Sequence, residues 1–266
     1  MLLRAIDLVV RRHPSQPPAV DHVSIDVSAG ELVAIVGPNG SGKSTLGRAL
    51  AGLVAIESGS VAGAQHRPPR VGLVLQDPAA QLIELTVADD VALGPQHAGL
   101  APLEVSARVE HEVGAAHVAH LWHRDPAALS GGQQQRVAVA AIAACEVDVL
   151  VLDEPTALLD EPARRDFAAR VRELAHGRGV LWITQEPDEV AACDRVVVLD
   201  AGAVAWQGGI DAWLADPAIA ATWGLELPAA ARIAHELARR GVHLPSGDQP
   251  RTVDELFARI AEVAGG

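Results

Sequence analysis

The chain has 266 residues with a net charge of −13, and 49% of its residues are hydrophobic although only 3% are aromatic. This composition predicts one large domain, or one domain with an appendage, built on an aliphatic core. The negative charge argues against nucleic acid as the main partner and against electrostatic binding to an anionic membrane, because both need clustered Lys and Arg.

The expected location of the protein follows from features that the sequence lacks. Its longest uncharged apolar run, residues 137–145, is too short to span a bilayer. Residues 1–12 have neither the length nor the cleavage site of a signal peptide. Cys145 and Cys193 are not in a metal-binding spacing and are typical of a reducing compartment. We expect a soluble, cytoplasmic protein that reaches a membrane only through a partner.

The N-terminal part of the chain is predicted to contain strands followed by a glycine-rich loop. Residues 1–36 are expected to form strands with a turn at 14–18, and the alternation in residues 1–12 is that of an edge strand. A buried strand over residues 31–36 leads into the loop, and a helix over residues 44–51 follows it.

The loop reads Gly37-Pro-Asn-Gly-Ser-Gly-Lys-Ser-Thr45 and matches the phosphate-loop pattern G-x-x-x-x-G-K-[ST]. Glycines in such a loop let backbone N–H groups turn toward one anion, and the start of the next helix adds the positive end of its dipole. Lys43 is expected to reach the β- and γ-phosphates of a nucleotide, and the Ser44 hydroxyl to ligate Mg²⁺. The flanking strand and helix are the context that a true phosphate-binding loop requires.

The elements that follow alternate between strand and helix. We predict a strand at 71–75, helices between 87 and 125, a helix from Ser130 to about Cys145, a strand at 147–152, a helix at 164–175, a strand at 179–183 and a hairpin of 195–199 with 203–206. Such alternation indicates an α/β core with a mainly parallel sheet. Residues from about 88 to 148 are expected to form a helical insertion within that core.

A change of pattern after Pro217 predicts a small C-terminal helical appendage over residues 217–266. One amphipathic helix is predicted over residues 229–240 and is ended by Gly241. A second helix is predicted from about residue 252 to residue 263, and its start has the capping-box pattern.

Two adjacent acids follow the predicted strand at 147–152. Asp153 and Glu154 would lie at the carboxyl end of that strand, where α/β sheets bind ligands. Asp153 is expected to hold Mg²⁺ through water, because Mg²⁺ keeps several of its waters in proteins. Glu154 is expected to polarise the attacking water.

A Ser-Gly-Gly turn is the third motif. Ser130 is expected to cap a helix whose first turn contains Gly131 and Gly132, which expose N–H groups to an anion. With its phosphate loop, this turn and its acidic strand in that order, the chain resembles the nucleotide-binding subunit of an ABC transporter over nearly its whole length. The resemblance implies a P-loop NTPase ABC cassette in residues 1–216, with a RecA-like core, an antiparallel β subdomain and an inserted helical subdomain, and a dimerisation extension in residues 217–266.

The resemblance also implies roles for individual residues. Gln76 matches a glutamine that touches Mg²⁺ and reports to the membrane subunit, and Asp160 matches an acid that communicates across a dimer. Two subunits meeting head to tail would form two ATP sites, because the Ser-Gly-Gly turn of each contacts the γ-phosphate held by the other. The residues expected on ATP and Mg²⁺ are Asn39, Gly40, Ser41, Gly42, Lys43, Ser44 and Thr45 of one subunit and Ser130, Gly131, Gly132 and Gln133 of the other.

Residues 71–95 and 227–255 are similar to the ATPases of energy-coupling factor (ECF) importers, which take up vitamins or metal ions such as cobalt and nickel. That subfamily implies a second ATPase subunit, identical or different, as partner. It also implies a transmembrane scaffold subunit and a separate substrate-binding membrane subunit. The chain would then lie on the cytoplasmic face of the membrane and would never touch the transported substrate.

Two positions depart from the family pattern. Gln185 stands where the family has a histidine that contacts the γ-phosphate; its amide can donate and accept hydrogen bonds but cannot carry a positive charge. It is therefore either a neutral variant or the mark of a slow site paired with a faster one. His13 stands where an aromatic residue, often Tyr, stacks on adenine, and it is either a stacking ring or an exposed loop residue.

Two other functions remain as alternatives. A non-transport ABC ATPase acting on ribosomes or DNA repair complexes usually has two cassettes or a long coiled coil, and basic surfaces. An ABC exporter or an amino-acid importer would also contain a cassette of this kind. The single cassette, the negative charge and the C-terminal extension favour an ECF importer.

Overall fold

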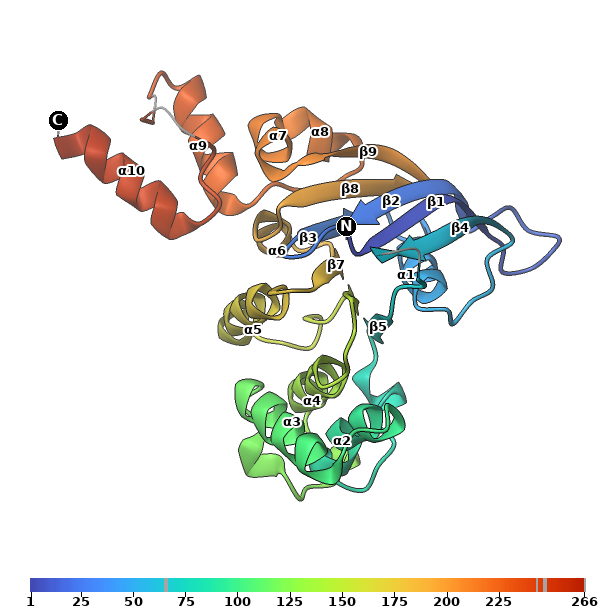
Figure 1. Ribbon diagram of the computed structural model, residues 1–266. Coiled ribbons are helices and arrows are strands. Elements are labelled where there is room, and N and C mark those ends of the chain that lie inside the picture. The colour runs from blue at the N-terminus through green and yellow to red at the C-terminus, as the bar shows by residue number, and fades with distance from the viewer. Residues whose placement is uncertain (65–66, 243, 246–247, 266) are drawn as a thin grey trace.

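The computed structural model describes residues 1–64, 67–242, 244–245 and 248–265. These residues form a three-stranded sheet and a six-stranded sheet, with helices around them (Figure 1). The strands are β1 (Leu3–Val10), β2 (Val20–Val27), β3 (Leu32–Val36), β4 (Ser58–Gly63), β5 (Val71–Val74), β6 (Val149–Asp153), β7 (Gly179–Ile183), β8 (Arg195–Asp200) and β9 (Ala203–Gly209).

The helices alternate with single strands between residues 131 and 200. They are α1 (Lys43–Leu50), α2 (Val87–His97), α3 (Pro102–Ala115), α4 (Gly131–Ala143), α5 (Glu161–Leu174), α6 (Pro187–Ala191), α7 (Ile210–Ala215), α8 (Pro217–Thr222), α9 (Ala229–Arg239) and α10 (Val253–Gly265), with short 3₁₀ turns η2 (Pro78–Ala80), η3 (Ala119–Leu121) and η4 (Pro126–Ala128). The predicted element types are confirmed, and most boundaries agree to within a few residues.

The smaller sheet has the order β2–β1–β4 and is antiparallel throughout. Leu3 pairs with Val27 on one side and with Gly63 on the other. The expectation that residues 1–12 form an edge strand is therefore wrong, because β1 is the central strand. Alternation of apolar and polar residues shows that one face of a strand is solvated, but it does not show how many strands pair with it. The second partner of β1 is β4, which follows α1 in the chain.

The larger sheet has the order β5–β6–β7–β3–β8–β9, parallel except for the last strand. Every residue of β3, β6 and β7 is buried, which explains why these strands read as continuous apolar runs. Ile183 pairs with both Ile35 and Asp153. The register therefore brings the glycine-rich loop after β3, the acids after β6 and the residues after β7 to one edge of the sheet.

Each face of the larger sheet is covered by its own apolar layer. The smaller sheet and α1 pack on one face, where α1 contributes Leu46 to the shared apolar layer. Helices α4 to α7 cover the other face, where Trp182 is fully buried and meets Phe167 edge-on at 5.9 Å between ring centroids. The predicted α/β core with a mainly parallel sheet is thereby confirmed.

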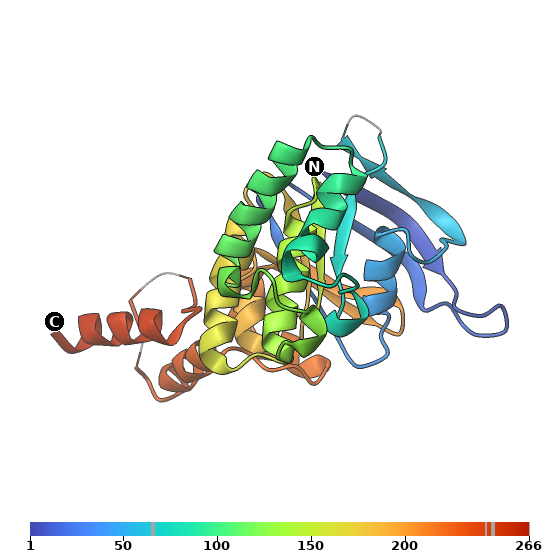
Figure 2. The ribbon, with the colours of Figure 1, turned by 90° about the horizontal axis from the view of Figure 1, so that it is seen from below.

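Helices α2, α3 and α4 lie side by side and form a second small core of their own, apart from the sheets (Figure 2). Thr86 caps α2 by accepting a hydrogen bond from the Asp89 N–H at 3.2 Å. Gly94 on α2 lies against the C-terminal end of α4, since a Cβ atom there would stand 2.1 Å from the Sγ of Cys145, two residues beyond that helix, and 4.0 Å from the Ala141 carbonyl oxygen. A larger residue at Gly94 would force the two helices apart.

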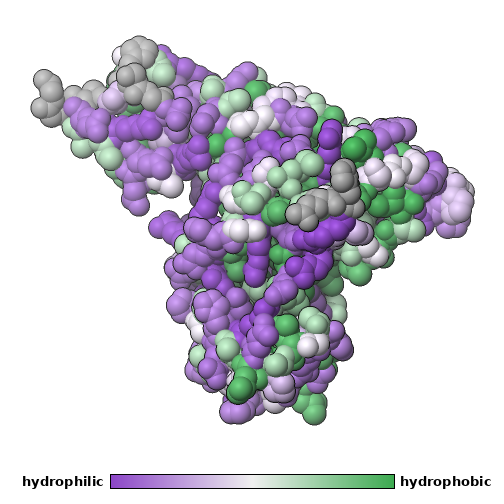
Figure 3. All heavy atoms as spheres, in the orientation of Figure 1, coloured by the Kyte–Doolittle hydropathy of each residue, from purple (hydrophilic) through white to green (hydrophobic). Residues whose placement is uncertain are grey.

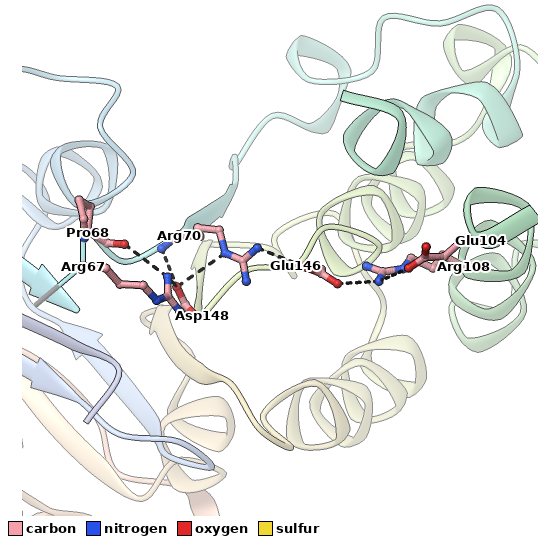
Figure 4. A network of polar contacts seen from close by, with 7 residues as sticks. All are labelled: Arg67, Pro68, Arg70, Glu104, Arg108, Glu146 and Asp148. Atoms are coloured by element: carbon pink, nitrogen blue, oxygen red, sulfur yellow. Dashed lines mark hydrogen bonds and ion pairs between the residues drawn. The ribbon is translucent and has the colours of Figure 1, made fainter. Parts of the chain in front are cut away.

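A chain of charged side chains joins this helical layer to the larger sheet (Figure 4). Arg108 on α3 donates to Glu146 at 2.7 Å, and Arg70, just before β5, donates to the same residue at 3.3 Å. Arg67 donates to Asp148, just before β6, at 2.8 Å. Each exposed pair contributes little stability by itself, but together they define one orientation of α3 relative to β5 and β6.

The C-terminal helices α9 and α10 project from the rest of the molecule (Figures 1 and 3). The two helices share a small apolar cluster of Ala230, Ala234 and Leu256. Phe257 remains 64% exposed and Ile233 45% exposed, so the apolar faces of these helices are only partly covered. In the part of the chain that the structure describes, we find no helix with the length and apolar character needed to cross a membrane.

Candidate functional site

A cavity of about 500 Å³ opens at the carboxyl edge of β3, β6 and β7. Its volume is within the range of about 300–1,000 Å³ that is common for ligand sites. The segments that follow β1, β3, β5, β6 and β7 and the start of α1 contribute residues to it. They are Arg12, Asn39, Gly40, Ser41, Gly42, Lys43, Ser44, Gln76, Glu154, Thr156, Ala157, Thr184, Gln185 and Glu186.

The glycine-rich loop follows β3 and has a backbone that only glycine adopts easily. Gly40 and Gly42 have φ angles of +80° and +102°, in the left-handed region. A Cβ atom on Gly42 would also lie 2.1 Å from the Ala19 carbonyl oxygen. Gly42 ends the loop and leads directly into α1, whose first residues have no side-chain cap, so the helix N–H groups are free for a ligand.

Two polar side chains in this loop suit an anion. The Lys43 Nζ donates to the carbonyl oxygens of Gly37 and Pro38 at 2.8 and 2.9 Å. Burial lowers the pKa of Lys43, while the charges of Glu154 and then Asp153 act in the opposite direction. The Ser41 Oγ is buried and has no hydrogen-bond partner among the described residues. A phosphate group in the cavity would supply that missing partner, so the loop fits such a ligand.

Asp153 ends β6 and is 1% exposed. Its Oδ1 accepts a hydrogen bond from the Ser44 Oγ at 2.9 Å, which joins the acidic strand to the start of α1. Burial raises the pKa of Asp153, and the hydrogen bond from Ser44 opposes that shift. A bound cation would favour the charged carboxylate at this position.

Glu154 has a φ of +47°, which is uncommon for a residue with a side chain. Its N–H donates to the Ile183 carbonyl at 3.0 Å, so the neighbouring strand holds the backbone in this conformation. The Gln76 Nε2 donates to the Glu154 Oε2 at 2.8 Å. A strained residue that lines a cavity is a frequent property of functional sites.

The chemistry of the oxygen groups around Ser44 fits Mg²⁺. The Ser44 hydroxyl, the Asp153 carboxylate and the Gln76 amide are hard oxygen ligands, and Mg²⁺ is bound by one or two carboxylates together with waters and phosphates. Within the described ranges no three His, Cys, Asp or Glu side chains gather in a metal-binding arrangement. A cation at this place would therefore depend on oxygens of the ligand and of water.

Gln185 follows β7 and reaches the glycine-rich loop. Its Nε2 donates to the Asn39 Oδ1 at 2.7 Å. Thr184, the preceding residue, and Thr156, which follows the acidic strand, both donate to the buried carboxylate of Glu189 on α6. Glu189 thus ties together the segments that follow β6 and β7. The sequence analysis missed Glu189, because its partners become neighbours only when these strands pair.

The Ser130 turn does not line the cavity. Ser130 caps α4 as predicted, with its Oγ accepting from the Gln133 N–H at 3.4 Å and the Gln133 Oε1 accepting from the Ser130 N–H at 3.1 Å. A Cβ on Gly131 would lie 2.9 Å from the Leu158 Cδ1. The turn therefore packs on the segment after Glu154, and its residues are not among those that line the cavity.

Asp160 and His13 also lie outside the cavity lining. The Asp160 Oδ1 caps α5 by accepting from the Ala163 N–H at 3.0 Å. The His13 Nδ1 is 2.8 Å from the Ser15 Oγ in an exposed turn, and the structure leaves its stacking on adenine a prediction. The neighbouring Arg12, which the sequence analysis did not single out, lines the cavity instead.

Comparison with known proteins gives consistent similarities along the chain. A family profile described as ABC transporter matches residues 20–157. The energy-coupling factor transporter ATP-binding protein EcfA1 of Symbiobacterium thermophilum is 40% identical over 257 residues, 92% of this chain and 89% of that protein. The protein of the same name from Lacticaseibacillus paracasei is 38% identical over 252 residues, 90% and 91% of the two chains.

A solved structure is similar over the same length. The structure of cbiO1 from Clostridium perfringens, described as part of the ABC transporter complex cbiONQ, has a TM-score of 0.72 and 28% identity. The similarity covers 88% of this chain and 98% of that one. The profile match at residues 20–157 contains the glycine-rich loop, Gln76, the Ser130 turn and Glu154.

Proposed function

The chain belongs to the ABC transporter family, and we propose that it is the subunit that binds and hydrolyses ATP to power an importer of the energy-coupling factor type. The observation that carries this proposal is the convergence of the glycine-rich loop, Gln76, Glu154 and Gln185 on one cavity. Identity of 40% to an energy-coupling factor transporter ATP-binding protein over 92% of the chain supports the subtype.

The phosphate loop would bind the triphosphate of ATP. The uncapped N–H groups at the start of α1 and the unpartnered Ser41 hydroxyl would act as donors, and Lys43 would leave the carbonyls of Gly37 and Pro38 to neutralise phosphate oxygens. A protein that catalyses phosphoryl transfer mainly binds and positions the phosphates, because the transition state of this reaction is stabilised mainly by charge.

Asp153, Ser44 and Gln76 would hold Mg²⁺, which supplies charge neutralisation at the phosphate oxygens when it is bound. Glu154 would accept a hydrogen bond from the attacking water and so orient it. The bond from Gln76 to Glu154 holds that carboxylate toward the cavity. Gln185 is already placed beside the loop by its bond to Asn39 and would donate its amide to a terminal phosphate oxygen.

The Ser130 turn would complete the site of a second subunit. Its position outside the cavity lining, with a capped and accessible helix start, suits a donor that acts on ATP held by a partner. Asp160 would lie near that same interface, and closure of the pair on ATP would be followed by opening after hydrolysis. The partner is a second ATPase subunit, either a copy of this chain or a related one.

The membrane partners would be a transmembrane scaffold and a substrate-binding subunit, with this chain on the cytoplasmic face. A vitamin or a transition-metal ion is the proposed class of cargo. The exposed apolar residues of α9 and α10 would contribute to contact between the two ATPase subunits.

Purification of the full, affinity-tagged chain from detergent-solubilised membranes of its own source tests the proposal. We expect a complex that contains a polytopic membrane protein and a second ATPase subunit and that hydrolyses ATP with Mg²⁺. Recovery of the chain with ribosomes or DNA repair proteins, or a purified complex without Mg²⁺-dependent ATPase activity, would contradict it.

A further inference from the structure

Arg12 lies just after β1 and reaches across from the smaller sheet to the start of α1. Its Nε is 3.1 Å from the Thr45 Oγ1, and its Nη2 donates to the same oxygen. Thr45 is only 2% exposed, whereas Arg12 is exposed and lines the cavity. The guanidinium therefore stands at the mouth of the site, with one hydroxyl as its side-chain partner.

Arg11, the preceding residue, has the same chemistry and a different environment. Its Nε donates to the Glu57 Oε2 at 2.9 Å and its Nη1 donates to the Gln16 carbonyl at 2.7 Å. Arg12 makes no ion pair with any residue that the structure describes. In a chain with a net charge of −13, an arginine without a carboxylate partner beside a phosphate loop has a charge available for an anionic ligand.

The two cations of the cavity act at different places. The Lys43 ammonium lies at the carbonyls of Gly37 and Pro38, at the start of the loop and near Asn39, where Gln185 also donates. Arg12 contacts Thr45, two residues beyond Lys43, and makes no hydrogen bond to Glu154 or Gln185. The terminal phosphate of a nucleotide, which is the one hydrolysed, would lie near Glu154 and Gln185. The phosphate next to the nucleoside would therefore lie near Arg12.

Resting on the proposed function, we propose that Arg12 is a nucleotide-binding residue whose guanidinium donates to the phosphate next to the nucleoside. The Thr45 hydroxyl holds the guanidinium at the edge of the cavity before a nucleotide arrives. A planar guanidinium can form two parallel hydrogen bonds to phosphate oxygens, which an ammonium group cannot reproduce. A contact to this phosphate strengthens the binding of ATP and ADP alike, whereas a contact to the terminal phosphate would favour ATP alone.

Equilibrium binding of ATP and of ADP to the full chain tests the proposal, with isothermal titration calorimetry as the measurement and Mg²⁺ present. We expect Arg12→Ala to weaken both nucleotides by about tenfold, because charge-assisted hydrogen bonds are lost. Arg12→Lys should weaken them less, and Arg11→Ala should remain within about twofold of the wild type. Thermal unfolding without nucleotide checks that each variant is folded.

The possible results separate this inference from the proposed function. If the wild type binds neither ATP nor ADP, the proposed function fails. If the wild type binds both and Arg12→Ala matches Arg11→Ala, only the role of Arg12 fails. A loss confined to ATP would also overturn the inference, because it would place Arg12 at the terminal phosphate.

Discussion

The cavity at the phosphate loop and the Ser130 turn differ in how complete they are. The cavity gathers residues after β1, β3, β5, β6 and β7, and within it Ser44 contacts Asp153, Gln76 contacts Glu154 and Gln185 contacts Asn39. The Ser130 turn has its own capping box and apolar contacts with Leu158 and Leu159. One region has a cavity that a ligand can enter, whereas the other does not line that cavity.

This difference predicts two classes of variants. Changes in the cavity should alter nucleotide binding or hydrolysis directly. Changes in the Ser130 turn should leave the affinity of the isolated chain for ATP intact and impair hydrolysis only in the assembled complex.

Glu154→Gln should lower the ATPase turnover of the complex by about 10²–10⁴-fold, the range attributed to a positioned acid or base. ATP binding should be retained, because the amide has nearly the shape of the carboxylate. Glu186→Gln is the matched control, since Glu186 lines the same cavity but pairs with Arg164 at 3.1 Å. Turnover of Glu154→Gln comparable to that of this control would exclude the assigned role.

Ser130→Ala should lower turnover by about tenfold while leaving the ATP affinity of the isolated chain unchanged. It should also remove about 1 kcal/mol of stability through the lost helix cap, which thermal unfolding would detect. Asp125→Ala is the control, because Asp125 caps the nearby η4 through the Ala127 N–H at 2.8 Å. If both variants reduce turnover equally, the effect comes from the loss of a helix cap and not from a lost contact between Ser130 and the ATP of a partner subunit.

Gln185→His should raise turnover several-fold if Gln185 limits the site, since one optimal donor can contribute roughly 10²–10³ in rate. The geometry allows the exchange, because Gln185 already reaches Asn39 at 2.7 Å. ATP turnover of the complex before and after the change is the measurement. An unchanged rate would mean that Gln185 is a neutral variant.

Glu189→Gln should change the pH dependence of stability. Burial raises the pKa of Glu189, although hydrogen bonds from Thr156 and Thr184 oppose this. The folded state therefore holds this proton more tightly than the unfolded chain does, and the carboxyl stabilises the fold most below about pH 4.3, the usual pKa of Glu. That contribution is lost as pH rises through the raised folded pKa.

Thermal unfolding of Glu189→Gln and of the wild type at several pH values checks this expectation. The difference in Tm should shift by a few degrees in favour of the variant between acid and neutral pH, because Gln does not ionise. Glu161→Gln, at an exposed carboxylate, should show a flat difference. A flat difference for Glu189→Gln as well would mean that the folded and the unfolded chain bind the Glu189 proton equally tightly.

The parts predictable from sequence are those in which neighbours along the chain decide the structure. Burial on both faces made β3, β6 and β7 continuous apolar runs, and the glycine-rich loop between β3 and α1 follows from local backbone requirements at Gly40 and Gly42. The helix cap at Ser130 likewise depends on two residues that are three positions apart in the chain, Ser130 and Gln133. These local rules were sufficient to place the phosphate loop and the Asp153–Glu154 pair.

The features that were missed depend on contacts between distant segments. β1 is central because β4 returns to it from beyond α1, and alternation alone gave no sign of this. Arg12 enters the cavity because the smaller sheet packs beside α1, so the side chain after β1 meets Thr45. Glu189 lies between Thr156 and Thr184 only after β6 and β7 have paired.

Leu158 connects the segment after Glu154 to the first turn of α4 through a single side chain. It follows Glu154 by four residues and lies against Gly131, at the helix start that, under the proposed function, would contact the nucleotide bound by a partner subunit. A displacement of this segment after cleavage at one centre would move the donor that closes the other. The two ATP sites of such an assembly would then hydrolyse ATP in turn and not independently. A Hill coefficient for ATP different from one would indicate this coupling.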